Sequence, residues 1–418
     1  MQDLLLTNVK ALHHVANNGQ AFLRGRELKS APGTENAWLL IKSGKIADYG
    51  TGQPPEVNPA VPILNCEQSE VIPSFVDSHT HLIYAGNREQ EFKQRLEGKT
   101  YAEIAAAGGG ILNSARRLRE SSEEELFESA WLRLQSLLSM GTGALEIKSG
   151  YGLSLDAELK MLRTARRLRA EAPIPIKSTF LGAHAVPSEY QNKREAYINL
   201  IIDEMLPAIA AENLADYLDV FCEENYFSVA EMNRLIEAGQ AYGLKAKLHL
   251  NQFSSLGSIE EAVKRSALSV DHLETMQPAD FEALRATDTI TTLLPGCSFF
   301  LNIPYAPARQ LIDQDNIVAL ATDFNPGSAP GGNMAQVFTL ACTQMKMTPE
   351  EALAACTLNG AAAIELSHQV GSIEVGKQAN LLILKPGYSP TSLAYHFGHP
   401  LIDKVLINGE ILEDAELD

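Results

Sequence analysis

From residue 71 to residue 322 the chain alternates short apolar runs with longer stretches in which apolar residues recur every three or four positions. The short runs have the composition of buried strands, and the longer stretches have the period of amphipathic helices. The predicted strands are Val71–Leu82, Ala144–Lys148, Ile176–Ala183, Tyr217–Cys222, Lys245–Leu250, Ser269–His272, Thr289–Leu294 and Ile317–Thr322. The predicted helices include Ala157–Ala170, Val229–Ala241 and Ile259–Lys264.

Eight strands that alternate with helices indicate an α/β fold, a (β/α)8 TIM-like barrel over residues 71–369. A doubly wound sheet is the alternative, but it would usually carry a glycine-rich phosphate turn after its first strand, and none follows here. Because the chemistry of such barrels sits at the carboxyl ends of the strands, polar residues at those ends are the candidates for function.

Both ends of the chain consist of short strand-like runs separated by turn residues. These runs are Leu4–Val9, Ala37–Ile41, Gly371–Val375, Ala379–Leu384 and Lys404–Ile407, and a proline-rich connector covers residues 53–62. Pairing the two ends with each other is the simplest way to satisfy their edges. We therefore expect residues 1–70 and 370–418 to form one composite β domain.

The composition narrows the choice of partners and compartment. With 52 acidic against 34 basic residues the net charge is −18, so the surface repels nucleic acid and anionic membranes, although a local cation can still bind a small anion. We expect a cytoplasmic protein, since no signal peptide or membrane helix is visible and the cysteines include no C-x-x-C pair. The five cysteines are Cys66, Cys222, Cys297, Cys342 and Cys356.

His79 and His81 follow the first predicted strand and are two residues apart. Residues i and i+2 of a strand point to the same side, so both imidazoles project together, as a divalent cation requires. Taken alone, two histidines at this spacing are explained equally well by a structural role and by a metal site. Its place after the apolar run 71–76 favours a metal site.

Three further polar residues end predicted strands: His249, His272 and Asp323. A lone histidine in an apolar strand is more often a core residue than a ligand. Asp323 could instead be the N-cap of a helix, but Gly327 and its neighbours make the following segment a loop, and a buried carboxylate needs a partner. Taken together, these strand ends predict a metal site.

At this point the sequence resembles the amidohydrolase superfamily, and within it the imidazolonepropionase family of histidine degradation. The order of the motifs carries the resemblance over essentially the whole chain. The motifs are Tyr101-Ala102-Glu103-Ile104, Gly108-Gly109-Gly110-Ile111, Lys148-Ser149-Gly150-Tyr151-Gly152-Leu153, Phe180-Leu181-Gly182-Ala183-His184, Ser269-Val270-Asp271-His272-Leu273-Glu274 and Ala321-Thr322-Asp323-Phe324-Asn325-Pro326-Gly327.

The resemblance implies a metal-dependent hydrolase that opens the lactam C–N bond of 4-imidazolone-5-propanoate to give N-formimidoyl-L-glutamate. It implies one zinc or iron ion per subunit, held by His79, His81, His249 and Asp323. No lysine stands where a bridging carbamylated lysine would be expected, which favours one ion over two. It also implies that the terminal β domain is a small β-sandwich and that the protein is a homodimer.

The same resemblance implies a set of substrate-binding residues: Arg88, Tyr151, His184, Gln252, Asn325, Gly327 and Ser328. Arg88 fits that role because its planar guanidinium can grip a carboxylate with two hydrogen bonds, although most arginines are simply solvated. Tyr151 and His184 would supply further donors near the carboxylate or the ring.

The catalytic residues implied are Asp323, His272 and Gln252. Asp323 would take the proton of a metal-activated water and pass it to the leaving ring nitrogen, while His272 would orient the nucleophile or polarise the carbonyl. The sequence leaves open which of the two performs each transfer. Gln252 stands where some relatives carry glutamate. A glutamine can form hydrogen bonds with a lactam but cannot shuttle protons. Ser328 stands where threonine is common, and it keeps the hydroxyl group.

Two other features stay open. The stretch Gly108–Ile111 could be a mobile piece over the site or a tight turn at the end of a helix. The remaining histidines (His13, His14, His368, His396 and His399) receive no role. The rival functions are a deaminase or dihydroorotase-like enzyme, which predicts a bridging lysine or a glutamate at position 252, and a non-catalytic scaffold, which predicts lost metal ligands.

Overall fold

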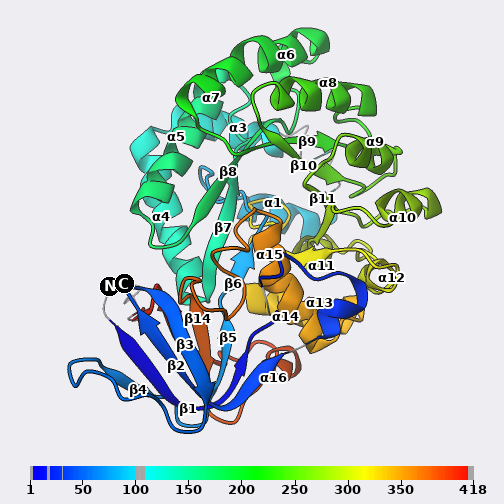
Figure 1. Ribbon diagram of the computed structural model, residues 1–418. Helices are drawn as coiled ribbons and strands as arrows, with labels where there is room; N and C mark the ends of the chain where they lie inside the picture. The colour runs from blue at the N-terminus through cyan, green and yellow to red at the C-terminus, as the bar shows by residue number, and fades with distance from the viewer. Residues whose placement is uncertain (1–2, 17–18, 31, 100–102, 104–108, 413–418) are drawn as a thin grey trace.

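A computed structural model describes residues 3–16, 19–30, 32–99, 103 and 109–412. It consists of a parallel barrel covered by helices and a separate mixed sheet (Figure 1). The predicted fold is therefore confirmed. The boundaries predicted at residues 70 and 369 remain predictions.

The barrel sheet has eight parallel strands in sequential order from β6 to β13. The middle strands agree with the predicted ranges because nearly all their side chains are buried on both faces, as in parallel strands covered by helices. The strands are β6 Phe75–Asp77, β7 Thr142–Lys148, β8 Ile176–Ala183, β9 Tyr217–Cys222, β10 Lys245–Leu250, β11 Ser269–His272, β12 Ile290–Leu293 and β13 Val318–Leu320.

The first predicted strand, Val71–Leu82, is divided between the two sheets. Its first part is β5 (Glu70–Pro73), which pairs with β1 and β14 in the terminal sheet. At Ser74 the chain changes partners: the amide of Ser74 still donates to Asn380, whereas that of Phe75 donates to Gly141 beside the barrel strand β7. One apolar run thus serves two cores.

The residues after β6 and β13 close the barrel. The amide of Asp323 donates to the carbonyl of His79 at 3.0 Å, and the amide of His81 donates to that of Phe324 at 2.9 Å. A parallel bridge joins Thr80 to Phe324. The seam between the first and last barrel strands is therefore made by three of the predicted metal ligands.

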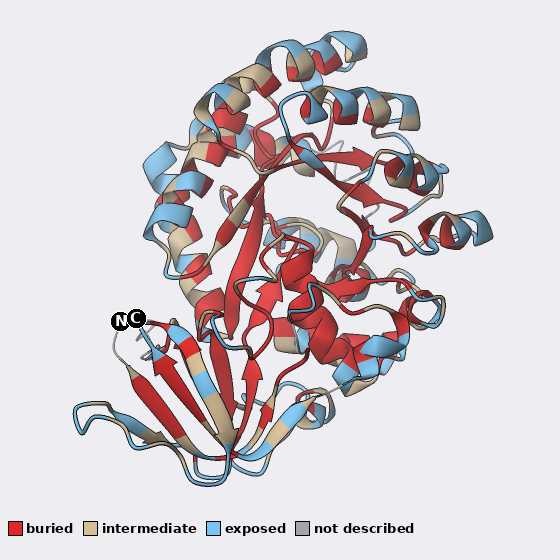
Figure 2. Ribbon diagram, viewed as in Figure 1, coloured by how far each residue is buried: buried red, intermediate tan, exposed pale blue. Residues whose placement is uncertain are grey.

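Helices surround the barrel with their apolar faces inward and their outer faces exposed (Figure 2). The three predicted helices correspond to α5, α8 and α9, and capping boxes start α4, α8 and α14. The helices are α1 Glu89–Leu96, α3 Ile111–Glu120, α4 Glu123–Ser139, α5 Leu155–Glu171, α6 Arg194–Leu200, α7 Leu206–Glu212, α8 Val229–Gln240, α9 Ser258–Lys264, α10 Pro278–Leu284, α11 Pro295–Leu301, α12 Ala308–Asp313, α13 Met334–Met345, α14 Pro349–Cys356, α15 Leu358–Ala362 and α16 Pro390–Tyr395. Short 3-10 turns cover Gly25–Lys29 and Ser188–Tyr190, and a π-helical turn, Ile201–Met205, joins α6 to α7.

The terminal sheet joins both ends of the chain in one mixed eight-stranded sheet, as the pairing prediction requires. In β14 alternate residues serve different cores: Leu381 and Ile383 face the core of the sheet, and Leu382 and Leu384 face the barrel core. The strands are β1 Leu4–His13, β2 Gly33–Lys42, β3 Lys45–Thr51, β4 Ile63–Asn65, β5 Glu70–Pro73, β14 Leu381–Leu384, β15 Ile402–Ile407 and β16 Glu410–Ile411.

The predicted strand Gly371–Val375 is wrong. Gly371 and Gly376 both have positive φ, and the segment between them makes bends and turns. Its apolar residue Ile373 is buried and its amide donates to His14, but no ladder forms. Among the described residues, no helix has both the length and the apolar character needed to cross a membrane.

Candidate metal centre and substrate pocket

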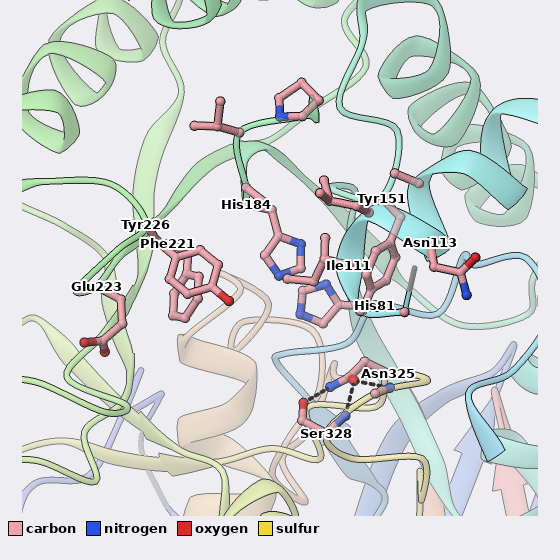
Figure 3. Close-up of a pocket in the computed structure, with 18 of the residues that line it drawn as sticks. His81, Ile111, Asn113, Tyr151, His184, Phe221, Glu223, Tyr226, Asn325 and Ser328 are labelled. Atoms are coloured by element: carbon pink, nitrogen blue, oxygen red, sulfur yellow. Dashed lines mark hydrogen bonds between the residues drawn. The ribbon is translucent and has the colours of Figure 1, made fainter. Parts of the chain in front are cut away.

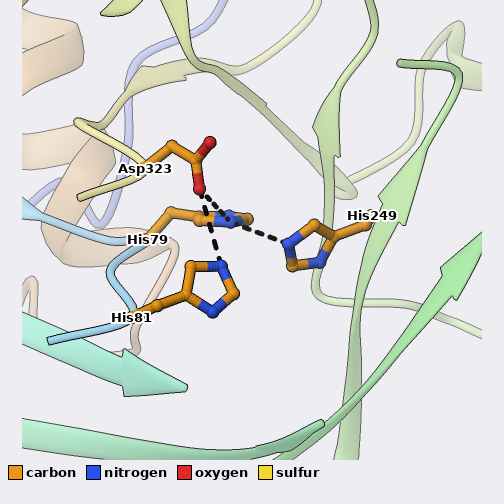
Figure 4. A group of neighbouring side chains, drawn as sticks. All are labelled: His79, His81, His249 and Asp323. Atoms are coloured by element: carbon orange, nitrogen blue, oxygen red, sulfur yellow. Dashed lines mark hydrogen bonds and ion pairs between the residues drawn. The ribbon is translucent and has the colours of Figure 1, made fainter. Parts of the chain in front are cut away.

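Four predicted ligands converge at the carboxyl end of the barrel (Figure 4). The Nε2 atoms of His79 and His249 are 3.1 Å apart, and Oδ1 of Asp323 lies 3.5 Å from Nε2 of both His79 and His81. All four side chains are buried, and their ligand atoms lie within 4.8 Å of one another. Three imidazoles and a carboxylate are a common donor set for zinc or iron.

Two aspartates orient two of these histidines. Nδ1 of His79 donates to Asp271 at 2.6 Å, and Nδ1 of His249 donates to Asp219 at 2.8 Å. When Nδ1 carries the hydrogen, Nε2 carries a lone pair, so two lone pairs face each other across 3.1 Å. A cation between them removes that repulsion, and the geometry therefore fits a bound metal ion.

The charge states of the ligands agree with metal binding. Burial lowers the pKa of His79 and of His249, which keeps both imidazoles neutral. Burial alone would raise the pKa of Asp323, but its hydrogen bond from His81 and the neighbouring histidines outweigh burial, so its pKa is lowered. Neutral imidazoles and an ionised carboxylate are the forms that coordinate a metal.

His272 lies beside the four ligands, with its ring centroid 5.2 Å from that of His249. Its Nδ1 is 3.6 Å from Oε1 of Glu274, which also accepts from Ser298 at 3.0 Å. Burial alone would lower the pKa of His272, but the charge of Glu274 raises it. Sequence reasoning gave Glu274 no role, although it stands only two residues beyond a candidate.

The backbone at this site is itself unusual. His272 has a φ of +84° and Asp323 a φ of +56°, a region that non-glycine residues seldom adopt. Such conformations persist where the surrounding structure holds them, and they concentrate at functional sites.

A cavity of about 1350 Å³ opens above the metal centre (Figure 3). Its lining includes every predicted substrate-binding and catalytic residue, and His79 is the one predicted metal ligand that is not part of it. The predicted residues in the lining are His81, Arg88, Tyr151, His184, His249, Gln252, His272, Asp323, Asn325, Gly327 and Ser328.

His184 and Tyr151 form one wall of the cavity, next to His81 (Figure 3). Nδ1 of His184 lies 3.0 Å from the carbonyl of Gly150, and burial lowers the pKa of this imidazole. The neutral ring thus carries its hydrogen on Nδ1 and leaves a lone pair on Nε2. Gly150 has a φ of +105°, and a Cβ there would lie 3.0 Å from Nδ1 of His184.

Arg88 also lines the cavity, next to Gly327, and it is held by a glutamate that the sequence did not single out. Its Nε and Nη2 donate to Glu91 at 2.8 and 2.6 Å, and the other oxygen of Glu91 accepts from the amide of Gly110 at 3.1 Å. A Cβ on Gly327 would lie 2.2 Å from Nη1 of Arg88. The glycine therefore gives the guanidinium room.

The loop after β13 is organised by Asn325. Its Oδ1 accepts from the amides of Gly327 and Ser328, each at 2.8 Å, and its Nδ2 donates to the carbonyl of Asp323 at 2.6 Å. Ser328 in turn lies 3.3 Å from Oδ2 of Asp323. Asn325 thus fixes the loop, and Ser328 reaches the metal ligand.

The glycine-rich stretch is only partly described. Gly108 lies outside the described residues, as do Tyr101, Ala102 and Ile104 of the neighbouring motif. Gly110 has positive φ and precedes α3, so a helix begins directly after this stretch. The alternative that a helix also ends at this stretch remains a prediction. The proposed mobility of this segment remains a prediction.

Comparisons with known proteins agree with this geometry. The model of the amidohydrolase family matches residues 71–412. An imidazolonepropionase from Christiangramia forsetii is 52% identical over 409 residues, which cover 98% of this chain and 100% of that protein. One from Flavobacterium johnsoniae is 53% identical over 409 residues, covering 98% and 99%.

Solved structures share the fold at low sequence identity. A triazine hydrolase variant superimposes with a TM-score of 0.74 at 14% identity, covering 98% of this chain and 94% of that one. The guanine deaminase of E. coli gives a TM-score of 0.70 at 14% identity, covering 99% of both chains.

Proposed function

The chain belongs to the imidazolonepropionases of the amidohydrolase family, and we propose that its substrate is 4-imidazolone-5-propanoate. Water would open the lactam C–N bond and give N-formimidoyl-L-glutamate, a step of histidine degradation. The observation that carries the proposal is the four-ligand group His79, His81, His249 and Asp323 at the floor of a cavity that also holds an arginine.

The metal would be one zinc or iron ion per subunit. The donor set fits either metal, and availability decides between them. When bound, the ion supplies Lewis-acid activation of water at neutral pH.

The substrate carboxylate would bind to Arg88. Glu91 engages Nε and Nη2 and so fixes the side chain, while Nη1 lies beside Gly327 of the cavity lining, from where it would reach the substrate carboxylate. The ring would lie towards the wall formed by His184 and Tyr151, where Nε2 of His184 can accept a hydrogen bond from a ring N–H. This differs from the donor role expected from the sequence, because Gly150 takes the hydrogen on Nδ1.

The proton steps follow from the two perturbed side chains. Asp323, whose pKa is lowered, is ionised and can accept the proton of the attacking water. His272, whose pKa is raised, keeps a hydrogen that it can donate to the carbonyl oxygen as negative charge develops there. Asp323 would then give its proton to the ring nitrogen as the C–N bond breaks.

Gln252 would recognise the lactam instead of moving protons. Its Nε2 donates to Cys297 at 3.3 Å, which fixes the orientation of the amide at the edge of the cavity. A deaminase of this fold would favour a glutamate at this position, so Gln252 supports the hydrolysis of a cyclic amide over deamination.

A cytoplasmic location and a homodimeric assembly are part of the proposal. All five cysteines are free, which suits the reducing cytoplasm. A homodimer is expected from the family, and sedimentation of the purified protein tests it.

The decisive experiment follows the loss of ultraviolet absorbance of freshly prepared 4-imidazolone-5-propanoate. The zinc- or iron-loaded protein should consume it, and Asp323→Asn should reduce the rate to background. The matched control is Asp203→Asn, which changes an exposed aspartate and should leave the rate unchanged. A metal-loaded protein that leaves this substrate intact but hydrolyses another cyclic amide would remove the assignment.

A further inference from the structure

Five ionisable side chains with no exposed surface lie inside the barrel, below the metal centre. Each comes from a barrel strand, where a charged residue replaces an apolar one on the inward face. They are Glu146 and Lys148 of β7, Asp219 of β9, Lys247 of β10 and Asp271 of β11. Buried charge is costly unless it is paired, so the arrangement of these groups has a cause.

Lys148 is at the centre of the group. Its Nζ donates to Asp219 at 2.8 Å and to Glu146 at 3.0 Å, and it lies 3.6 Å from Oδ2 of Asp271. Burial alone would lower the pKa of Lys148, but the three carboxylates outweigh burial and raise it. The side chain is therefore an ammonium ion shared by three anions.

Two of these anions are the aspartates that orient metal ligands. Oδ2 of Asp219 faces both Lys148 and Nδ1 of His249. Oδ2 of Asp271 faces both Lys148 and Nδ1 of His79. One ammonium thus links two carboxylate–histidine pairs that come from different strands.

We propose that Lys148 is a positioning residue of the metal centre. Its ammonium holds Asp219 and Asp271 at a fixed separation against their mutual repulsion, and the aspartates aim the Nε2 atoms of His249 and His79 at one point. The inference rests on the metal site of the proposed function but not on its substrate.

Lys247 provides a matched comparison in the same layer. It is equally buried, but it donates to Ser269 at 3.0 Å and to the carbonyl of Ala363 at 2.9 Å, and it is 3.5 Å from Glu146. It makes no ion pair with Asp219. Its link to Asp271 runs through Ser269, which donates to Oδ1 of Asp271 at 2.6 Å, and through its charge, which lowers the pKa of Asp271. Loss of its charge therefore leaves Lys148 and the Asp219–His249 pair in place.

The test compares zinc affinity in the full-length wild type, Lys148→Met, Lys148→Gln and Lys247→Met, by competition with a chromophoric chelator. Loss of an outer partner of a metal ligand typically weakens metal binding roughly 10- to 100-fold. We expect a loss of that size in Lys148→Met and a smaller one in Lys148→Gln, whose amide can still donate. Lys247→Met should lose less than Lys148→Met, because only one of the two aspartates is affected.

Absorption spectra of the cobalt-substituted proteins give a second readout that general destabilisation would not move. They should change in both Lys148 variants, and the change in Lys247→Met should be smaller than that in Lys148→Met. Wild-type affinity and spectrum in a folded Lys148→Met protein, or an equal loss in Lys247→Met, would overturn the proposal. If neither Lys148 variant folds while Lys247→Met does, Lys148 is structural and the proposal also fails.

The outcome is separable from that of the proposed function. A wild type that binds zinc but does not open the imidazolone ring contradicts the substrate and leaves the role of Lys148 intact. A wild type that binds no metal contradicts both.

Discussion

The terminal sheet and the barrel both have buried interiors, but these interiors consist of different kinds of side chain. The core of the sheet consists of side chains such as Leu6, Val9, Leu39 and Ile41, which pack without any need for a specific partner. The carboxyl end of the barrel buries histidines, aspartates and lysines, each of which requires a partner in a fixed geometry.

The difference separates two uses of burial. Apolar burial stabilises the fold and tolerates small shifts, whereas buried charge stabilises little and fixes the orientation of groups that bind. Damage to the sheet should therefore lower stability, and damage to the barrel mouth should lower metal or substrate binding. The predictions below test that separation.

Removal of the metal should have the largest effect. A strong chelator should reduce activity to background, because water activation is lost. At free metal 100-fold above Kd, binding adds about 2.7 kcal/mol to stability, and this increment should disappear as well. Activity assays and thermal melting measure both, and readdition of zinc or iron is the control. Full activity after complete removal would show that the barrel mouth is not a metal site.

Leu39→Ala should have the largest effect on the sheet. Leu39 is fully buried in its core, so we expect a loss of roughly 2–5 kcal/mol in the free energy of unfolding. Metal content and the rate per folded molecule should not change. Ile63→Ala in β4 of the same sheet is the control, since Ile63 is 61% exposed. A large loss of metal in Leu39→Ala would mean that the two interiors are not separable.

Arg88→Ala tests the barrel mouth without touching the metal. Loss of a charge-assisted pair of hydrogen bonds costs roughly 1.5–3 kcal/mol, or about 10- to 100-fold in KM. Metal content should stay at the wild-type level. Arg116→Ala is the control, because Arg116 also lines the cavity but its guanidinium donates to Asn113. An equal loss of metal and substrate binding would assign Arg88 a structural role.

The smallest effect is expected at Glu70, where the sheet holds a charge of its own. Burial would raise the pKa of Glu70, but hydrogen bonds from His13 and Lys10 outweigh burial and lower it. A lowered pKa means that the stabilisation is present above the unfolded pKa of 4.5 and is lost as pH falls through the folded value. The stability difference between wild type and Glu70→Gln should be about 1 kcal/mol near pH 7 and should vanish in acid. Urea unfolding of the metal-free proteins measures it. A difference that grows in acid would contradict the assignment.

The sequence was informative where one physical rule acts alone. The strands β8 to β11 agree with the predicted ranges to the residue because each is a short run of buried positions that ends at turn residues or at a polar strand end. The metal ligands were found because histidines and an aspartate stand at strand ends, where apolar patterning breaks off. The bounds of β6 were predicted wrongly because the apolar run 71–82 contributes to both sheets. The pattern of apolar residues gives no sign that the chain changes its pairing partner at Ser74.

What the sequence missed depends on pairs of residues that meet only in the folded chain. Glu91 looks like an ordinary helical glutamate until Arg88 and Gly110 are placed beside it. Lys148 and Asp271 each belong to a family motif, but they are 123 positions apart, and no pattern near either residue predicts that they meet. The spacing of Glu146 and Lys148, two charges on one face of a buried strand, was the available signal.

The seam of the barrel has a consequence for how the protein matures. At this seam Asp77 accepts hydrogen bonds from the amide and hydroxyl of Thr322, which lies 245 residues further along the chain. Contacts of such long range form late, after the loop-closure entropy of the intervening chain has been overcome. A growing chain therefore carries His79, His81 and His249 long before Asp323 exists, and the fourth ligand joins the other three only when the circle of strands is finished.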